Sequence, residues 1–360
     1  MGKQLFRSSI FILFLFSSNS VFSQGKVSGL IKAGPGDATK LTQAYLNPLF
    51  KGLGIGLNSG WNNTAESKNT ARFEFRFGLT GALIPQEDKF FDVTKIGLSN
   101  HIRPANNSSP LAPTMAGNKT SAPQLDVFDD NNQKIESFTL PQGQNLPLIP
   151  APQLQGTVGL PNGIDITLRA VPKVSLGNDF GSLSMLGAGI KLEILPLIIG
   201  KTLDKISPVD IAVAVGFSQL NYQLPLDVRA PEGSVPKDAE QNQDFNNQMI
   251  DAKFSGINAE LILSKKLLFF TPFISAGYNT SQTNAKLKGN YPIVTGATGF
   301  VGQRTYTTFT NPVDINQNDV SGFRGNIGFQ LNIAVLRIYS SYTVGDYNAF
   351  NFGLGVGLGK

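Results

Sequence analysis

The chain of 360 residues contains no cysteine and only one histidine, His101. The lack of cysteine excludes disulfides, thiolate metal sites, a cysteine nucleophile and a lipoprotein anchor, because all of these need sulfur. A single histidine excludes zinc sites built from several histidines, and any Ser-His-Asp chemistry would have to use His101. We therefore expect no enzyme, no cofactor and no metal, and we predict no catalytic residue.

Charge is scarce as well. Charged residues make up 15% of the chain, against about 25% in an ordinary soluble domain. The net charge of +5 falls to +3 without Lys3 and Arg7, and no basic run is longer than Lys265-Lys266, so we expect no nucleic-acid partner. The 38 glycines and the aromatic share of 10% favour an all-β chain with many turns.

Long hydrophobic runs are missing except near the N-terminus. There, Lys3 and Arg7 precede the apolar run 10–16, and residues 21–23 fit a small-residue cleavage site. This pattern predicts a secretory signal peptide over residues 1–23. No later stretch approaches 18 uncharged apolar residues, so we expect no membrane helix. The exported protein is then either soluble or crosses a membrane as a closed sheet.

A period-two pattern of apolar residues recurs along the chain. In the last segment Phe350, Phe352 and Leu354 share one face, and glycines from Gly353 to Gly359 fall on the other. A membrane-spanning strand needs about 9–11 residues that alternate in this way. Similar segments are 53–62, 72–79, 164–170, 186–194 and 324–335, with weaker ones at 90–101, 209–224, 249–264, 267–283, 286–294 and 336–344.

These segments predict an all-β fold, an antiparallel transmembrane β-barrel of about 12 strands (range 10–14) with a short N-terminal helix. A soluble β-sandwich is the alternative, but the strands are longer than those of ordinary sheets. Charged side chains on the polar faces either neutralise one another and hold a small barrel together or line a pathway and set its selectivity. The candidate lumen-facing residues are Arg72, Glu74, Arg76, Asp165, Arg169, Lys191, Glu193, Arg324, Asn326 and Gln330.

Between the signal peptide and the predicted barrel, residues 24–52 contain a helical pattern. The helix should begin near Asp37 and end near Asn47, because Pro48 disfavours helical geometry in the residue before it. Two interpretations remain open, a periplasmic lead-in helix and a plug inside the lumen. The candidate residues of the plug helix are Asp37, Leu41 and Tyr45.

The predicted barrel extends over residues 53–360 and carries two long polar loops, at about 100–157 and 225–248. Transmembrane barrels have short periplasmic turns and longer extracellular loops. We therefore expect both loops on the extracellular side.

Several stretches resemble a known family. Residues 37–64, 140–160, 169–173 (RAVPK), 264–267 (SKKL) and 342–359 are similar to an uncharacterised outer-membrane β-barrel family, a domain of unknown function common in Bacteroidota. The resemblance implies a single barrel in the outer membrane of a Gram-negative bacterium, and it carries no activity or site residue. A looser likeness to long-chain fatty-acid transporter barrels rests on the N-terminal helix and the Asn47-Pro48 step.

The expected function is that of an outer-membrane barrel acting as a narrow channel or transporter for small or apolar solutes. Its partners would be outer-membrane lipid and such a solute, and the sequence does not identify which proteins, if any, bind it. The alternative is a structural or surface-interaction barrel that transports nothing. A less favoured third hypothesis is an outer-membrane hydrolase that depends on His101.

Overall fold

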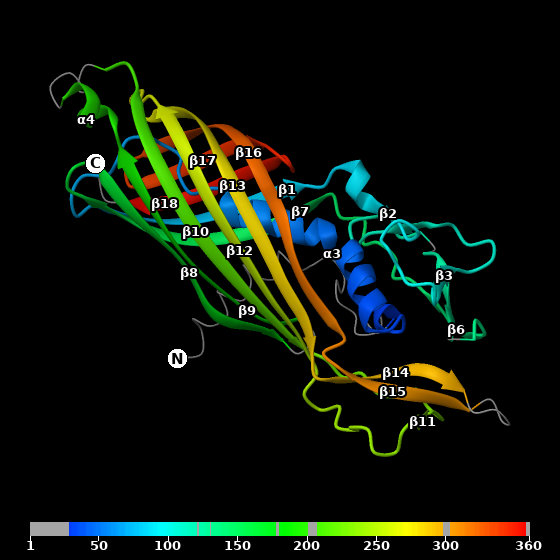
Figure 1. Ribbon diagram of the computed structural model, residues 1–360. Coiled ribbons are helices and arrows are strands. Elements are labelled where there is room, and N and C mark those ends of the chain that lie inside the picture. Colours follow the sequence, from blue (N-terminus) through cyan, green and yellow to red (C-terminus); the bar gives the residue numbers. More distant parts are fainter. Residues whose placement is uncertain are drawn as a thin grey trace.

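The computed structural model describes residues 29–120, 122–129, 131–177, 180–200, 207–297 and 303–357. The predicted signal peptide lies outside these described residues. Ten antiparallel strands form a closed barrel in the order β1-β18-β17-β16-β13-β12-β10-β9-β8-β7 (Figure 1). Their bounds are β1 (Phe73–Leu83), β7 (Leu148–Leu160), β8 (Ile164–Gly177), β9 (Gly181–Glu193), β10 (Asp210–Pro225), β12 (Met249–Ser264), β13 (Phe270–Lys288), β16 (Val313–Ile333), β17 (Leu336–Val344) and β18 (Ala349–Gly357).

The outer surface of the barrel is apolar because the alternating residues point outward. Along β18 every second residue is exposed, among them Phe350, Phe352 and Leu354, while the residues between them are buried. Exposed large apolar side chains also lie on the neighbouring strands, for example Phe75 on β1 and Ile327 on β16. Exposed apolar faces of this extent are typical of contact with lipid or with another protein.

The barrel has ten strands, at the lower end of the predicted range, and not about twelve. Two weak segments were wrongly predicted to be barrel strands. Residues 90–101 form only the short strand β2 (Phe90–Asp92) and turns outside the barrel. Residues 286–294 are divided between the end of β13 and β14 (Asn290–Ala297), which belongs to a separate sheet.

The segment 53–62 was also predicted to be a strand, and this prediction is wrong. Helix α3 (Pro35–Asn58) continues through Pro48 to Asn58. The glycines that alternate here serve a close approach to the barrel wall: a Cβ atom on Gly54 would lie 2.1 Å from Ser281 Oγ, and one on Gly56 would lie 2.2 Å from the Ala151 Cβ. Within the described residues, no helix combines the length and the hydropathy that crossing a bilayer requires.

Strand β7 was missed because it lies at the end of the predicted loop 100–157. It contains Pro150 and Pro152, which are uncommon in paired strands because proline cannot donate a backbone hydrogen bond. The connection between β1 and β7 therefore covers residues 84–147. The predicted loop at 225–248 agrees closely with the connection between β10 and β12.

Long connections emerge from one end of the barrel, which we call the loop end; the opposite end is the turn end. The first connection carries the 3₁₀-helix η1 (Gln86–Lys89) and two small sheets, and β14 forms a third small sheet (Figure 1). On the turn end, a short helix α4 (Leu195–Ile199) follows β9. The remaining strands are β3 (Ile102–Pro104), β4 (Leu111–Pro113), β5 (Gln124–Phe128), β6 (Lys134–Thr139), β11 (Val235–Pro236) and β15 (Arg304–Thr310).

Apolar clusters pack along most of the length of α3. On one side Phe50 and Leu57 pack with inward-facing residues of the long strands, including Phe254 and Ile315. On the other side Leu41 and Tyr45 pack with residues from the connection 84–147. The helix is therefore enclosed between the barrel wall and the first long connection (Figure 1).

Candidate functional site

The interior of the barrel is occupied by the chain's own residues 35–68, which we call the inner segment. It consists of α3 and the irregular chain that follows it as far as Lys68. Helix α3 contacts strands on opposite sides of the barrel, including β7, β12 and β16, and Figure 1 shows it running into the barrel. Charged and polar side chains of the wall point at this segment.

Arg169 on β8 binds the C-terminal end of α3. Its Nη1 donates to the carbonyl oxygen of Leu57 at 2.9 Å and its Nη2 to that of Ser59 at 2.8 Å. The last carbonyls of a helix have no partner within the helix and carry partial negative charge, so a cation is favoured at this position. The guanidinium also stacks 3.7 Å from the ring centre of Trp61 and is fully buried.

Two more arginines reach the chain just after the helix. Arg76 on β1 donates to the carbonyl oxygens of Gly60 and Trp61, the latter at 2.8 Å. Arg324 on β16 lies 3.4 Å from Ser59 Oγ and forms a buried ion pair with Glu260 at 3.6 Å. Three buried arginines from β1, β8 and β16 therefore converge on the C-terminus of α3.

Nearer the turn end, the contacts are ion pairs. Lys191 pairs with Asp165 at 3.0 Å and donates to the carbonyl oxygens of Thr64 and Glu66. These bonds hold the inner segment against β8 and β9.

A second group of ion pairs lies next to the first. Lys68 pairs with Glu74 at 2.6 Å, and Arg337 and Tyr339 also bind Glu74. Glu193 accepts hydrogen bonds from the Ser67 amide and hydroxyl, the first at 2.9 Å. Buried charges are tolerated when they are paired and hydrogen-bonded in this way.

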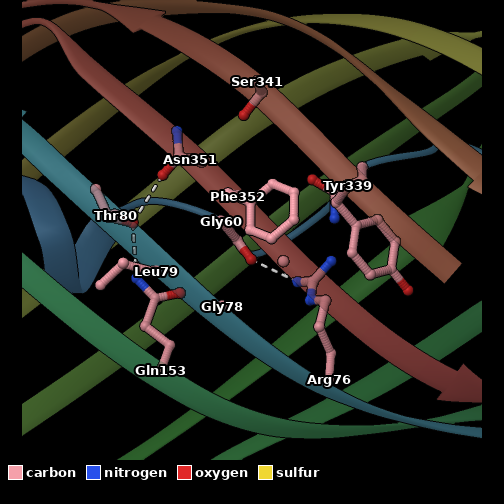
Figure 2. Close-up of a pocket in the computed structure, with 12 residues that line it drawn as sticks. Gly60, Arg76, Gly78, Leu79, Thr80, Gln153, Tyr339, Ser341, Asn351 and Phe352 are labelled. Atoms are coloured by element: carbon pink, nitrogen blue, oxygen red, sulfur yellow. Dashed lines mark hydrogen bonds between the residues drawn. The ribbon is translucent and has the colours of Figure 1, made fainter. Parts of the chain in front are cut away.

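A small pocket lies beside Arg76. Figure 2 shows the pocket bordered by Arg76, Thr80, Gln153, Tyr339 and Asn351. Its cavity of about 20 Å³ has room for about one water molecule. Hydrogen bonds link its lining: Gln153 donates to Thr80, and Thr80 donates to Asn351 at 2.7 Å.

The residues predicted to face the interior are placed as follows. Arg72, although predicted with them, precedes β1 and is exposed, because the strand begins only at Phe73. Asn326 and Gln330 on β16 lie toward the turn end and bond to side chains of the wall, Asn326 to Ser275 at 2.7 Å. The others are buried around the inner segment: Glu74, Arg76, Asp165, Arg169, Lys191, Glu193 and Arg324.

The three residues named for the predicted plug helix lie on α3 near the loop end. Asp37 accepts a hydrogen bond from the Ser99 amide at 2.9 Å, and Leu41 is fully buried. The Tyr45 hydroxyl donates to the Gln142 carbonyl oxygen at 2.9 Å, and burial raises the pKa of Tyr45 to about 12 although a hydrogen bond with Gln144 acts in the opposite direction.

Sequence reasoning missed several residues of this site. Trp61 was assigned to a strand, whereas it lies in the lumen against Gly189 and Gly216, where its ring leaves no room for a Cβ atom. Gln153 and Gln155 lay in a predicted loop. The alternation of Gln153 and Gln155 with Pro152 and Leu154 is the signal that could have identified a strand there.

His101 lies in the first long connection, away from the barrel interior. Its ring Nδ1 is 3.2 Å from the carbonyl oxygen of Phe128, and the side chain is exposed. In the part of the chain that the structure describes, no group of three or more His, Cys, Asp or Glu side chains is placed to hold a metal ion.

Three solved barrels illustrate the similarity to known structures. The translocator domain of the autotransporter NalP from Neisseria meningitidis is 7% identical, with a TM-score of 0.30 over 91% of this chain and 99% of that chain. The outer membrane protease OmpT from Escherichia coli is 9% identical, with a TM-score of 0.30 over 83% and 98%. The toluene transporter TbuX from Ralstonia pickettii is 10% identical, with a TM-score of 0.21 over 81% and 90%.

These low identities and TM-scores carry no functional meaning for this chain. No curated protein matches the sequence. The model of the Family of unknown function (DUF6588), however, matches residues 2–358, and the chain belongs to this family.

Proposed function

We propose that this protein is an exported outer-membrane β-barrel that is closed at rest by its inner segment and admits small apolar solutes when that segment moves. The observation that carries the proposal is the convergence of Arg76, Arg169 and Arg324 on the C-terminus of α3. These bonds close the turn-end half of the interior, and they are reversible because no covalent link fixes the segment to the wall.

The membrane location is supported by the two faces of the barrel strands. Phe323 and Ile327 on β16 are exposed apolar residues, whereas Asp314 and Asn316, nearer the loop end, are exposed polar residues. Tyr278 and Phe323 contact each other edge to face at this boundary, with their ring centres 5.2 Å apart. Aromatic residues at such a boundary are typical of the interface between lipid and water.

The solute class follows from the loop-end half of the interior. Leu46, Leu49 and Leu53 of α3 are only partly buried, and they lie against apolar residues of the wall. The interior of a water-filled barrel is polar instead. A polar solute entering here would lose its hydrogen bonds to water without replacement, and we therefore propose an apolar solute.

Conductance across planar bilayers tests the closed state. We expect wild-type protein to pass no steady current and Arg169→Met to pass intermittent current, because two carbonyls at the end of α3 lose their donors. Arg72→Met is the matched control, since Arg72 is exposed and lies outside this group. A steadily open wild-type pore would show that the inner segment does not close the barrel.

Uptake tests transport. Cells that express the protein should take up radiolabelled dodecane faster than cells without it, and uptake of radiolabelled sucrose should not change. If neither solute enters faster, the alternative function is favoured, a surface-interaction barrel. That alternative is motivated by the small sheets at the loop end, including β14 and β15 (Figure 1).

A further inference from the structure

The seam between β7 and β8 is only partly paired. Pairing extends from Gln155–Arg169 to Leu160–Ile164 and stops there. Beyond it, residues 148–154 of β7 remain paired with β1, and β8 continues to Gly177 beside β9. Among the ten seams of the barrel, all within described residues, it is the one where both strands continue without pairing each other.

Proline explains why the pairing stops. If the register were continued past Gln155 and Arg169, Pro152 would lie opposite Pro172 and Pro150 opposite Val174. Proline has no backbone N–H to donate, so strands rich in proline cannot extend such a ladder. Strand β8 also shifts its register against β9 between Val171 and Val174. The unpaired seam is therefore a property of the sequence.

Where the unpaired part of this seam begins, apolar side chains lie on both sides of the wall; farther toward the loop end, Lys173 is exposed, and Gln153 is buried with its amide bonded to the Gly56 carbonyl oxygen. Outside, Leu154 and Leu168 are 49% and 53% exposed and belong to the apolar outer surface. Inside, Val171 packs against the cluster that contains Phe50 and Leu57 of α3, with Leu53 beside it. An apolar molecule that crosses next to Leu154 and Leu168 meets apolar side chains at both ends of its path.

The paired part of the seam borders the unpaired part on its turn-end side. Arg169 Nε donates to Gln155 Oε1 at 3.0 Å, across the first pair of the ladder. The same guanidinium binds the end of α3 through the Leu57 and Ser59 carbonyls. All of its nitrogens are thus engaged, and the charge is not offered to a ligand headgroup.

We propose that the unpaired β7–β8 seam is a lateral portal through which an uncharged hydrocarbon-like solute passes between the bilayer and the apolar loop-end half of the interior. This rests on the proposed function, because it supplies the route for the same apolar solute. Arg169 and Gln155 border the portal on its turn-end side, and Leu53 of α3 lies on its inner side. No backbone ladder joins β7 and β8 along the portal, so opening it breaks no ladder hydrogen bond between these strands.

Photo-crosslinking tests the portal directly. A dodecane that carries a diazirine is added to phosphatidylcholine vesicles containing the full-length protein, and adducts are mapped by mass spectrometry after illumination. We expect adducts on the lipid-facing residue Leu168 and on the interior residue Leu53. Leu168 serves as the internal reference, since it faces the bilayer in every variant.

Closing the seam should abolish only the interior adduct. Because the chain has no cysteine, Pro152→Cys/Pro172→Cys gives a single possible disulfide across the seam. A matched control is Val215→Cys/Ala259→Cys, across the paired seam of β10 and β12. We expect the first variant, when oxidised, to lose the Leu53 adduct and keep the Leu168 adduct, and the second to keep both.

A second variant covers the case in which that disulfide does not form. Pro152→Val/Pro172→Val restores two backbone donors and should extend the pairing, with loss of the Leu53 adduct. Its control is Pro272→Val, at a wall position paired with Phe329. No Leu53 adduct in wild-type protein, or equal Leu53 adducts in the closed and control variants, would overturn the portal.

A separate experiment distinguishes a free hydrocarbon from the acyl chain of a bilayer lipid as the molecule that occupies the portal. A phosphatidylcholine with a diazirine in its acyl chain replaces the dodecane probe, and we expect it to label Leu168 but not Leu53. Labelling of Leu53 by this lipid would show that bilayer lipid occupies the portal, contrary to the proposal. Crosslinking needs no net transport, so its outcome is separate from that of the uptake test. A barrel that takes up no dodecane can still give the Leu53 adduct, and a barrel that takes up dodecane can fail to give it.

Discussion

The two halves of the barrel interior are built on different principles. In the loop-end half, α3 packs through Phe50 and Leu46 against apolar wall residues, as in the core of a soluble protein. In the turn-end half, the end of α3 is held by buried arginines and ion pairs. The change occurs along single strands: β16 points Ile315 inward near the loop end and Arg324 inward farther on. The same strands therefore present apolar side chains to α3 near the loop end and polar side chains to its C-terminal end.

This difference shows how a short inner segment can be both anchored and movable. Apolar packing is non-directional and tolerates sliding, whereas charge-assisted hydrogen bonds to helix carbonyls fix a position. We therefore expect substitutions in the apolar half to affect stability most, and substitutions in the arginine cluster to affect closure most.

The largest effect should come from Phe50→Ala in the apolar half. Phe50 is 2% exposed and its ring centre lies 6.0 Å from that of Phe254. Removing a buried phenyl ring costs about 3–5 kcal/mol of the free energy of unfolding. Urea titration in detergent micelles measures it. Leu111→Ala, on an exposed residue of the first connection, should change stability by no more than about 0.5 kcal/mol. Equal effects of the two substitutions would contradict the apolar core.

A smaller loss is expected for Arg169→Met in the polar half. The substitution leaves the Leu57 and Ser59 carbonyls without their donors, and an unsatisfied buried acceptor costs about 1–3 kcal/mol. Methionine fills part of the space, so we expect a net loss of about 2 kcal/mol in the same titration. Arg72→Met should leave the free energy of unfolding unchanged. The difference between the two variants therefore measures the loss of the contacts between Arg169 and the end of α3, and not the general loss of one positive charge.

The smallest effect concerns Tyr45, at the outer end of the apolar half. Tyr45→Phe removes the hydrogen bond to the Gln142 carbonyl and should cost about 1 kcal/mol at neutral pH. The pKa of Tyr45 is raised to about 12 in the folded protein by burial, above the usual value of about 10. Between these values the unfolded state loses its proton first, so folded stability falls as pH rises.

Tyr45→Phe should remove this part of the alkaline loss. The free energy of unfolding, measured from pH 9 to pH 12, should therefore fall less steeply in the variant than in wild-type protein. Tyr291 and Tyr347, whose pKa values are also raised by burial, keep some of the slope. An unchanged slope would mean that the Tyr45 ring is not shielded from water.

Period-two alternation was sufficient to locate most barrel strands, because one face of each strand meets an apolar phase and the other a filled interior. It failed at 53–62, where part of α3 was taken for a strand. The glycines that let α3 approach Ala151 and Ser281 are two residues apart, which is also the spacing of residues on one face of a strand. It failed at β7 because Pro150 and Pro152 are compatible with a strand only where one edge is unpaired. Both failures fall on segments that define the site.

The sequence allowed single side chains of the site to be predicted, but not the contacts that they make. Charged residues at inward positions, such as Arg76 and Lys191, were recognisable from the alternation on their own strands. Their partners were not, because Arg76, Arg169 and Arg324 bind backbone carbonyls of the inner segment, and a carbonyl has no sequence signature. Trp61 was missed for a related reason, since it belongs to irregular chain between a helix and a strand.

Fluorescence of Trp61 tests the closed interior most directly. It is the sole tryptophan, it is 4% exposed, and it lies against Arg169. We expect water-soluble acrylamide to quench Trp61 weakly in wild-type and Arg72→Met protein in phosphatidylcholine vesicles, and strongly in Arg169→Met. Strong quenching of the folded wild-type protein would mean that water reaches the end of α3 freely, and that the arginines do not close the barrel.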